Sequence, residues 1–515
     1  MAAPSASAPY HTLHLVFRRQ RRKLLPFPPG PPRWPIFGNA LSMPLEYIHV
    51  FFKDLGKRLG TKIIYLEALG QPMIVLNDAA IAQELLEKRS AVYSSRPELP
   101  MLTDVAGFRG FFSTMQYGQE WRSHRRMFQQ YFSETRLHVF EERGLDFVRK
   151  GLLPNLYEDP QGLKAHMHNF LGGLSTSITY GLPIQRRNDP YVHHFEKTLA
   201  STTAISSPGG YLVNIIPLLK YIPEWFPGAT FKKVAREVYG ELLEMRDDPY
   251  NKCNAGVAPG SFVDTALDRL AHRDDRDDDG LHILHIKQTA ATVYVALAET
   301  SMAASMTFVL AMLKYPAVQS KLQRELDSVI GSDRLPDFAD LPQLIYLAAV
   351  VKEVLRWNPV APTGVPHLTT EDDIYEGFYI PRNCIIFANA FAMLHDEDIF
   401  PDPKEFIPER FLKNDRELRD DLPNPERFAS FGFGRRICPG RHIAVSMLYI
   451  TIASVLHLFD INPSLDHEGK PVEVKAEFLG DSIVSNPAPF KCEISPRKGK
   501  DVQGLLQEYF GNEPI

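Results

Sequence analysis

The sequence predicts a mainly α-helical protein of the α+β class, in which a single large domain carries a small β-sheet region. Helical periodicity dominates the 515-residue chain. One long segment, residues 281–313, is apolar nearly all round, which is typical of a helix that crosses a protein interior. Only three short segments have the character of strands, and they are too few for a doubly wound sheet: residues 63–69, 72–77 and 384–390.

The N-terminal residues, 1–25, predict a basic tail without a complete transmembrane anchor. The only apolar run in this tail, residues 13–17, is far shorter than the about 20 residues that span a bilayer. A basic cluster at residues 18–23 follows it, and a proline-rich hinge at residues 26–35 comes next. We therefore expect one folded domain over residues 26–515.

Helical segments then follow one another along the chain. Residues 79–89 and 121–132 carry apolar side chains at helical spacing, and the second of these is also strongly basic. Residues 98–118, between them, are apolar but broken by glycines, which suits a loop that covers a pocket. A helix over residues 281–313 would be about 50 Å long at a rise of 1.5 Å per residue.

Composition excludes several classes of function. The net charge of −5, from 57 basic and 62 acidic residues, gives no indication of nucleic-acid binding. The four cysteines lie far apart with no CxxC spacing, which argues against a cysteine zinc cage or a dithiol redox motif. The segment GFGRRI (residues 432–437) has isoleucine where a dinucleotide fingerprint has its third glycine, and no Walker sequence occurs. The chain therefore shows no nucleotide site of its own.

The loop around Cys438 reads FASFGFGRRICPGRHIA, which is more elaborate than a buried thiol requires. One thiolate cannot build a zinc site of four protein ligands, but a haem iron needs only one strong axial ligand. The glycines of the loop would let the backbone approach a porphyrin. Phe431 can pack on the macrocycle, and Arg436 can pair with a propionate. The basic loop should also favour the thiolate over the thiol.

Four motifs resemble those of the cytochrome P450 family, and they occur in the order of that family. FGFGRRICPG (residues 431–440) matches its signature loop, and EVLR (residues 353–356) matches its ExxR pair. PERF (residues 408–411) and WRSHR (residues 121–125) match two further elements. The resemblance extends from residue 26 to about residue 495. It implies the P450 fold, with haem b between the long central helix and the cysteine loop.

The resemblance also implies roles for individual residues. Cys438 would ligate the iron, with Phe431, Arg436 and Gly440 also contacting the haem. The other implied haem residues, which would hold its propionates, are Trp121, Arg125 and His367. The implied structural cluster around the cysteine loop consists of Glu353, Arg356 and Arg410. Two plainer interpretations stay open: Glu353 and Arg356 as a surface pair one helical turn apart, and His367 as a histidine that satisfies the backbone.

The long helix carries the segment ALAET (residues 296–300), which resembles the family's motif of a small residue, glycine, any residue, an acid and threonine. Glu299 and Thr300 suit proton delivery during dioxygen activation, a role that typically contributes roughly 10²- to 10⁴-fold. A plainer role for Thr300 is a hydrogen bond to the carbonyl one turn back. Leu297 departs from the pattern because glycine usually occupies its position, and we expect this leucine to restrict the oxygen groove.

Electrons must come from a partner, because the chain has no flavin or nicotinamide site. The resemblance implies an NADPH-dependent flavoprotein reductase of the cytochrome P450 reductase type, with a cytochrome b-type protein as a further donor. A basic landing patch is one interpretation of four arginines, and scattered surface charges are the other: Arg122, Arg126, Arg435 and Arg441. We expect a monomer that does not bind nucleic acid.

A proline-broken apolar segment, residues 209–228, could dip into a membrane surface or pack into the core. By position in the family, an apolar substrate pocket would be lined by Phe108, Phe111, Phe112, Val295, Ala296, Leu297, Val365 and Phe478. Such a wall favours an apolar substrate, of terpenoid or polycyclic type. The motifs look like those of fungal secondary-metabolism members, which implies the cytosolic face of the endoplasmic reticulum membrane although the chain has no transmembrane anchor.

We therefore interpret the chain as a haem-thiolate monooxygenase that inserts one atom of dioxygen into an apolar small molecule. An enzymatic alternative keeps the haem but performs isomerisation, dehydration or peroxide chemistry, and Leu297 is the feature that favours it. A second alternative, from another functional class, is a haem-binding sensor or carrier without turnover. The Glu299–Thr300 pair argues against that second alternative.

Overall fold

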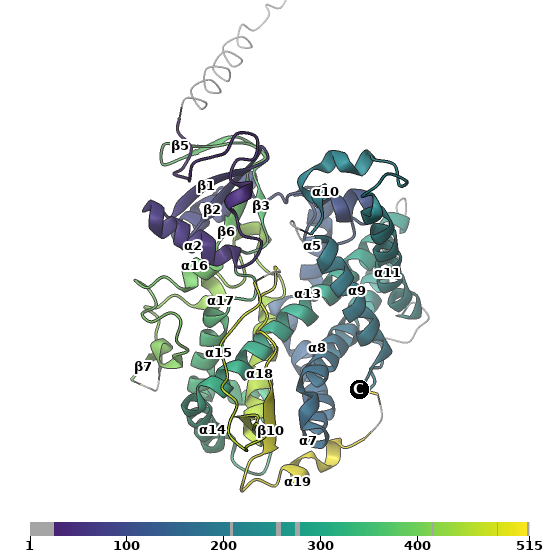
Figure 1. Ribbon diagram of the computed structural model, residues 1–515. Helices are drawn as coiled ribbons and strands as arrows, with labels where there is room; N and C mark the ends of the chain where they lie inside the picture. Colours follow the sequence, from purple (N-terminus) through teal and green to yellow (C-terminus); the bar gives the residue numbers. More distant parts are fainter. Residues whose placement is uncertain are drawn as a thin grey trace, which may run out of the picture. The chain divides into compact units, whose positions relative to one another are not determined.

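The computed structural model describes residues 25–206, 210–253, 259–272, 279–414, 417–480, 483–511 and 514–515. Its internal contacts divide the chain into two compact units, which are described separately (Figure 1). The first unit comprises the chain up to Pro97 together with Thr363–Met393 and Gly432–Arg436. The second comprises Glu98–Pro362, Leu394–Phe431 and Ile437–Ile515. The predicted basic tail lies outside the described residues except for Leu25.

The first unit is built around a four-stranded sheet in the order β1-β2-β6-β3. β1 (Ile63–Ala68) and β2 (Gln71–Leu76) form a hairpin. Its two turn residues, Leu69 and Gly70, both have positive φ, as a type I′ turn requires. β2 then pairs in parallel with β6 (Ile385–Ala388), about 310 residues further along the chain. The last strand, β3 (His367–Leu368), runs antiparallel to β6 and fixes the position of His367.

The remaining elements of the first unit are short, apart from one helix that covers the sheet. α2 (Ile48–Leu59) packs Phe52 and Leu55 onto Ile64 and Leu66 of β1, which forms a small apolar core. The other elements are α3 (Ala79–Ala82) with a continuing helical turn Gln83–Lys88, α4 (Ser90–Tyr93), the hairpin β4 (Asp373–Tyr375) and β5 (Phe378–Ile380), α16 (Ala390–Leu394, the last residue of which belongs to the second unit) and the turn Gly434–Arg436.

The second unit is helical and is organised around α13 (Asp279–Lys314), which packs on α5, α8, α11 and α18 (Figure 1). Its other helices are α5 (Gln119–Tyr131), α6 (Leu137–Asp146), α7 (Leu153–Glu158), α8 (Leu163–Tyr180), α9 (Pro190–Ser206), α10 (Leu212–Ile215), α11 (Thr230–Lys252), α12 (Phe262–Ala271), α14 (Pro316–Ile330), α15 (Ile345–Trp357), α17 (Pro425–Phe428), α18 (Arg441–Leu458) and α19 (Val502–Leu506). Two small hairpins complete it: β7 (Leu412–Lys413) with β8 (Glu417–Leu418), and β9 (Phe459–Pro463) with β10 (Cys492–Pro496).

The burial of α13 is interrupted in the middle of the helix. The side chains at residues 288–294 are buried, and so are nearly all of those at residues 301–313. Between these stretches Ala296 is exposed, and the other residues from Val295 to Thr300 are half-buried. An apolar helix in the middle of a folded unit would normally bury this stretch as well, so its accessibility marks a candidate site.

The predicted fold class, mainly helical with small sheets, is confirmed. The long helix predicted over residues 281–313 is α13, and the helix predicted over residues 121–132 is α5. The three predicted strands are β1, β2 and β6, to within two residues at most of their ends. The segment predicted as a loop, residues 98–118, contains one helical turn, Met101–Val105, that the broken pattern had hidden.

Within the described part of the chain, two helices are long and apolar enough to cross a membrane, namely residues 280–314 of α13 and all of α18. Both lie mostly buried within the protein, as core helices do, so they are weak evidence for a membrane span.

Candidate functional site

Cys438 lies in a hydrogen-bonded loop at the start of α18. Its backbone N–H donates to the carbonyl of Phe431 over 2.8 Å, which closes the loop around the cysteine. Gly440 is the N-cap of α18, and its backbone N–H hydrogen-bonds the Cys438 thiol. A Cβ added at Gly440 would meet only Phe128, at 4.0 Å, so the polypeptide leaves open space beside the thiol. Phe431 itself is half-buried.

The glycines of the loop do not all serve the purpose that the sequence suggested. Gly434 has φ of +57°, and a Cβ on it would lie 2.0 Å from the carbonyl oxygen of Leu86. The polypeptide itself therefore requires this glycine, irrespective of any porphyrin. Gly432 has φ of +77° with open space around it, so its backbone conformation alone accounts for the glycine.

The electrostatic environment of Cys438 differs from the one expected. Burial raises the pKa of this thiol, while the Gly440 N–H and the charges of Arg125 and Arg441 offset part of that effect. The basic surroundings alone therefore do not hold a thiolate, because the cost of desolvating the charged form is larger. A coordinated metal ion deprotonates a thiol outright. Binding of iron would therefore produce the thiolate that the arginines favour only in part.

The arginine and tryptophan of the WRSHR motif lie on α5. Trp121 is buried, with its ring centroid 5.2 Å from that of Tyr117. Arg125 is half-buried one turn later. Burial lowers the pKa of Arg125, while the nearby Cys438 acts in the opposite direction and Arg441 adds to the lowering. The second unit therefore brings a half-buried guanidinium, which a carboxylate would stabilise, into the neighbourhood of the cysteine.

Glu299 and Thr300 lie on the accessible stretch of α13. The Nδ2 of Asn486 donates to Glu299 Oε1 over 3.2 Å. The hydroxyl of Thr300 donates to the carbonyl of Ala296, one turn back, over 2.5 Å. This is the plainer role considered for the threonine, so its hydroxyl has to rotate before it can serve another acceptor. Asn486 was missed by sequence reasoning because its segment, SNPAPF, has no periodicity and matches no motif.

Glu353, Arg356 and Arg410 form one buried cluster. The Nε and Nη2 of Arg356 donate to the two carboxylate oxygens of Glu353 over 2.7 and 2.8 Å, and both side chains are fully buried. The Nε of Arg410 donates to the same carboxylate over 3.1 Å, as does the backbone N–H of Ile407 over 2.8 Å. The geometry excludes a solvent-exposed pair and makes Glu353 the centre of a network with four donors.

The first unit contributes a separate basic cluster made of Arg96, His367 and Arg436, all of them buried. Burial and the charge of Arg436 together lower the pKa of Arg96. Two guanidinium groups held together in this way favour a carboxylate as ligand, in keeping with the propionate role expected of Arg436. Sequence reasoning missed Arg96, which sits in a segment, SSRPE, without a recognisable motif.

His367 makes a hydrogen bond to the backbone, and its expected contact with a propionate stays a prediction. Its Nδ1 donates to the carbonyl of Tyr93 over 2.7 Å, which is the plainer interpretation considered from the sequence. The other ring nitrogen is then a hydrogen-bond acceptor unless the ring is protonated. Burial and the charges of Arg96 and Arg436 lower the pKa of His367 and disfavour that protonation. The donors of this cluster are therefore the two arginines, with the histidine packed against them.

The residues predicted to line the substrate pocket occupy different environments. Phe108 and Phe111 are buried in an apolar cluster that also contains Phe195 and Tyr294. Phe112 stacks on His124 of α5, at 6.0 Å between ring centroids, so it serves the packing of that helix. The other predicted lining residues are Val295, Ala296 and Leu297 on the accessible stretch of α13, Phe478 packed edge-on against Trp357 at 5.3 Å, and Val365, which is 36% exposed in the first unit.

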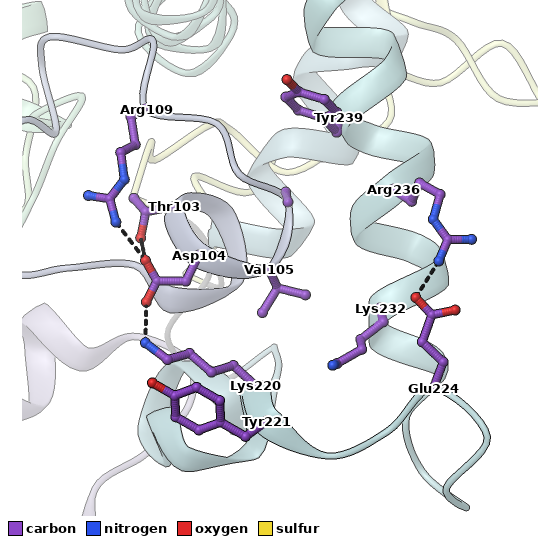
Figure 2. A pocket seen from close by; sticks show the side chains of 11 residues that line it. Thr103, Asp104, Val105, Arg109, Lys220, Tyr221, Glu224, Lys232, Arg236 and Tyr239 are labelled. Atoms are coloured by element: carbon purple, nitrogen blue, oxygen red, sulfur yellow. Dashed lines mark hydrogen bonds and ion pairs between the residues drawn. The ribbon is translucent and has the colours of Figure 1, made fainter.

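A polar pocket of about 630 Å³ also lies in the second unit, near the N-terminus of α11 (Figure 2). Asp104 accepts hydrogen bonds from Arg109 and Lys220 over 2.7 and 2.8 Å. Arg236 and Glu224 form a second ion pair in its wall. None of the predicted pocket residues lines this cavity. Its charged lining differs from the apolar wall that the resemblance implies, so we do not assign the substrate to it.

These features fit a haem with a cysteine ligand. The second unit offers a half-buried thiol beside a glycine without a side chain, a helix stretch left accessible in its middle, and the half-buried Arg125. The first unit offers two buried arginines suited to carboxylates. Within the second unit, Cys438 would hold the iron and Arg125 a propionate. Within the first unit, Arg96 and Arg436 are by themselves suited to bind a carboxylate.

Comparisons with known proteins also indicate a haem protein with a cysteine ligand. The family model for cytochrome P450 matches residues 28–494. The chain is 40% identical over 492 residues to the cytochrome P450 monooxygenase ple1 of Rhodocybe pseudopiperita, covering 95% of this chain and 92% of that protein. It is 39% identical over 487 residues to cytochrome P450 monooxygenase 98 of Postia placenta, covering 94% and 93%. It is 36% identical over 488 residues to the tryptamine 4-monooxygenase of Psilocybe cyanescens, covering 93% and 94%. The thiol loop, the buried ExxR pair and this similarity along nearly the whole chain lead to one conclusion: the chain belongs to the cytochrome P450 family.

Proposed function

We propose that this protein is a monooxygenase of secondary metabolism, which hydroxylates or otherwise oxidises an apolar small molecule of terpenoid or polycyclic type. The observation that carries the proposal is the accessible stretch of α13, where Glu299 and Thr300 lie in an otherwise buried helix. A sensor or carrier has no need of an acid and an alcohol at such a place. Relatives that are named monooxygenases, among them a tryptamine 4-monooxygenase, support the same reaction class.

Three residues of the chain have separate roles in the proposed reaction. Haem, when bound, supplies the iron at which dioxygen is activated, and a thiolate ligand favours cleavage of the O–O bond. The positive charge of Arg125 favours the negatively charged thiolate form of Cys438. Asn486 orients the carboxylate of Glu299 by a hydrogen bond, and this carboxylate can pass protons to the accessible stretch of α13. Thr300 can donate a proton from its hydroxyl once it leaves the carbonyl of Ala296, because this single rotation redirects the O–H.

Isotope labelling tests the proposed reaction. The purified protein is supplied with NADPH, a flavoprotein reductase, ¹⁸O₂ and a panel of apolar compounds. The masses of the products are then measured by mass spectrometry. A monooxygenase places one ¹⁸O atom in the product. Isomerisation or dehydration adds no label, and peroxide chemistry adds oxygen from added peroxide instead. A carrier shows no substrate-dependent use of NADPH, and that result would contradict the proposal.

Leu297 is expected to restrict the space over the accessible stretch of α13, where it is half-buried. Replacing it with glycine should change the fraction of NADPH that is converted into product, because the leucine side chain narrows the oxygen groove. We expect a change of about twofold or more, measured as product formed per NADPH consumed. If Leu297→Gly forms the same amount of product per NADPH consumed as the wild type, the leucine side chain does not narrow the groove.

We also propose that a separate NADPH-dependent reductase docks on a surface that includes α5. Arg122 and Arg126 are exposed on this helix, one turn apart. Reversing both charges to glutamate should reduce reductase-supported turnover about tenfold at low salt, because an acidic partner would be repelled. Peroxide-driven turnover and the response to Lys233→Glu, an exposed charge on α11, serve as controls. Equal losses with reductase and with peroxide would contradict docking at this helix.

An association with the cytosolic face of the endoplasmic reticulum membrane is part of the proposal. The segment from α10 to Gly228 leaves several large apolar side chains exposed, the most exposed being Trp225 (81%), Leu218 (74%) and Tyr221 (74%). Such exposure disfavours core packing, the alternative considered from the sequence, for all but a few members such as Leu219, which packs inward. Co-sedimentation of the protein with phospholipid vesicles measures this association.

A further inference from the structure

A group of metal-ligating side chains lies where α5 meets α13, apart from the residues assigned to haem. It consists of Glu120 and His124 on α5 and His285 on α13. One donor atom from each residue lies within 4.8 Å of the others. His124 is fully buried and His285 is 6% exposed, whereas Glu120 is exposed. A buried imidazole normally has a hydrogen-bond partner for each ring nitrogen.

The hydrogen bonding of His124 shows which of its nitrogens is available. Its Nδ1 lies 2.8 Å from the hydroxyl of Thr289. Its Nε2 is buried and, among the residues that the structure describes, has no hydrogen-bond partner. A histidine that binds a metal commonly donates its other ring N–H to an oxygen acceptor, and Thr289 provides that acceptor. The arrangement leaves the lone pair of Nε2 facing the cluster.

A second buried polar atom without a partner lies close to this histidine. The Oε1 of Gln288, on α13, is buried and has no hydrogen-bond partner within the described part of the chain. Burial and the charge of His285 lower the pKa of His124 to about 3, whereas the Gln288 side chain, which lies within hydrogen-bonding range of this histidine, raises it. His124 Nε2 and Gln288 Oε1 are therefore buried without a hydrogen bond of good geometry, and a polar group beside them would satisfy both.

We propose that Glu120, His124 and His285 bind a divalent cation, with Zn²⁺ as the best match. Two imidazoles and one carboxylate form a ligand set that zinc prefers, usually with a water in the fourth position. A water bound there could donate to Gln288 Oε1. In a tetrahedral site with bonds of about 2.0–2.2 Å the donor atoms lie about 3.4 Å apart. The cluster must therefore contract, and the exposed Glu120 side chain can move to allow it.

The ion would join two helices that carry the residues of the haem site. Glu120 and His124 immediately precede Trp121 and Arg125 on α5, and His285 is on the helix that carries Glu299 and Thr300. A metal bond between α5 and α13 would restrict the movement of α5 and so stabilise the position of Arg125. The proposed role is structural, and it does not depend on the reaction that the enzyme catalyses.

Metal analysis of the tag-free holoprotein tests the site. The protein is stripped with a chelator, titrated with ZnCl₂ and analysed for zinc and haem iron by mass spectrometry. We expect one zinc per chain, together with a rise of a few degrees in the melting temperature at saturating zinc. Glu120→Gln and His124→Gln should each raise the Kd for zinc at least about tenfold. His168→Gln should not, although His168 also pairs with a carboxylate, Glu196, at 2.8 Å.

The zinc affinities of these variants distinguish a specific site from adventitious zinc binding. Equal zinc affinity in the wild type, Glu120→Gln and His124→Gln would overturn the proposal, and so would the absence of zinc uptake by the wild type. If His124→Gln fails to fold, Glu120→Gln still decides the question. Glu120 is exposed, and a normal haem content would show that this variant is folded.

Discussion

Replacing Cys438 with alanine should abolish the strongly red-shifted Soret band of the reduced protein with carbon monoxide. It should also reduce NADPH-supported turnover at least about a thousandfold, because rate enhancement by this reaction class depends on the thiolate. The structure adds a dependence on pH. Burial raises the pKa of the free thiol, so it holds its proton at neutral pH, and coordination of iron must release that proton. The apparent affinity for haem should therefore rise as the pH increases through the neutral range.

Matched cysteines supply the controls for this experiment. Cys492 is half-buried on β10, and Cys492→Ala should leave the spectrum and the turnover unchanged. Cys438→Ser retains the shape of the side chain and keeps the test interpretable if the alanine variant binds no haem. A normal red-shifted band in a folded Cys438→Ala protein would show that another residue ligates the iron.

Replacing Glu353 with alanine should destabilise the second unit severely. The change leaves Arg356 fully buried without its carboxylate, and removing one partner of a buried ion pair typically costs about 3–5 kcal/mol. Arg356 also donates to the carbonyls of Leu394, Pro403 and Glu405, so its misplacement would loosen that whole segment. We expect a large loss of haem-containing protein on expression and a thermal inactivation half-life shortened at least about tenfold, since unfolding of large proteins is commonly irreversible.

Two comparisons show whether the effect comes from burial. Arg410→Ala should be milder than Glu353→Ala, because Arg410 makes only one of the four hydrogen bonds to the carboxylate. Arg419→Ala removes an exposed ion pair with Asp421 and should not change the half-life measurably. A Glu353→Ala protein with the inactivation half-life of the wild type would contradict the network described here.

The candidate site could be predicted in part from short motifs. The loop around Cys438 and the Glu353–Arg356 pair were found because their spacing is local. The third partner, Arg410, was found only because a family motif marks it. Arg96 and Asn486 were missed, because each reaches its partners from a segment distant in sequence and without periodicity. The same holds for the proposed cation site, whose ligands lie about 160 residues apart on α5 and α13.

For several predicted residues, the structure shows contacts or burial that the motifs did not indicate. Gly434 was expected to make room for a porphyrin, but the structure shows the carbonyl of Leu86 in the space that a side chain would need. The propionate role expected of His367 stays a prediction, and the structure adds that its Nδ1 donates to the carbonyl of Tyr93. The basic loop was expected to hold a thiolate, but burial has the larger effect on the pKa of Cys438. In each case the deciding contact or desolvation comes from outside the motif.

The sequence by itself determined the fold class, the long apolar helix α13, the strands β1 and β2 and the identity of the thiol loop. These depend on hydrophobic periodicity and local spacing, which a chain carries in its own order of residues. Only the tertiary structure decided that β2 pairs with β6 and that Arg96 joins Arg436. It also decided that α13 loses its burial between Val295 and Thr300. Burial and long-range pairing depend on which other segments pack against a given segment, and the local sequence of that segment does not specify them.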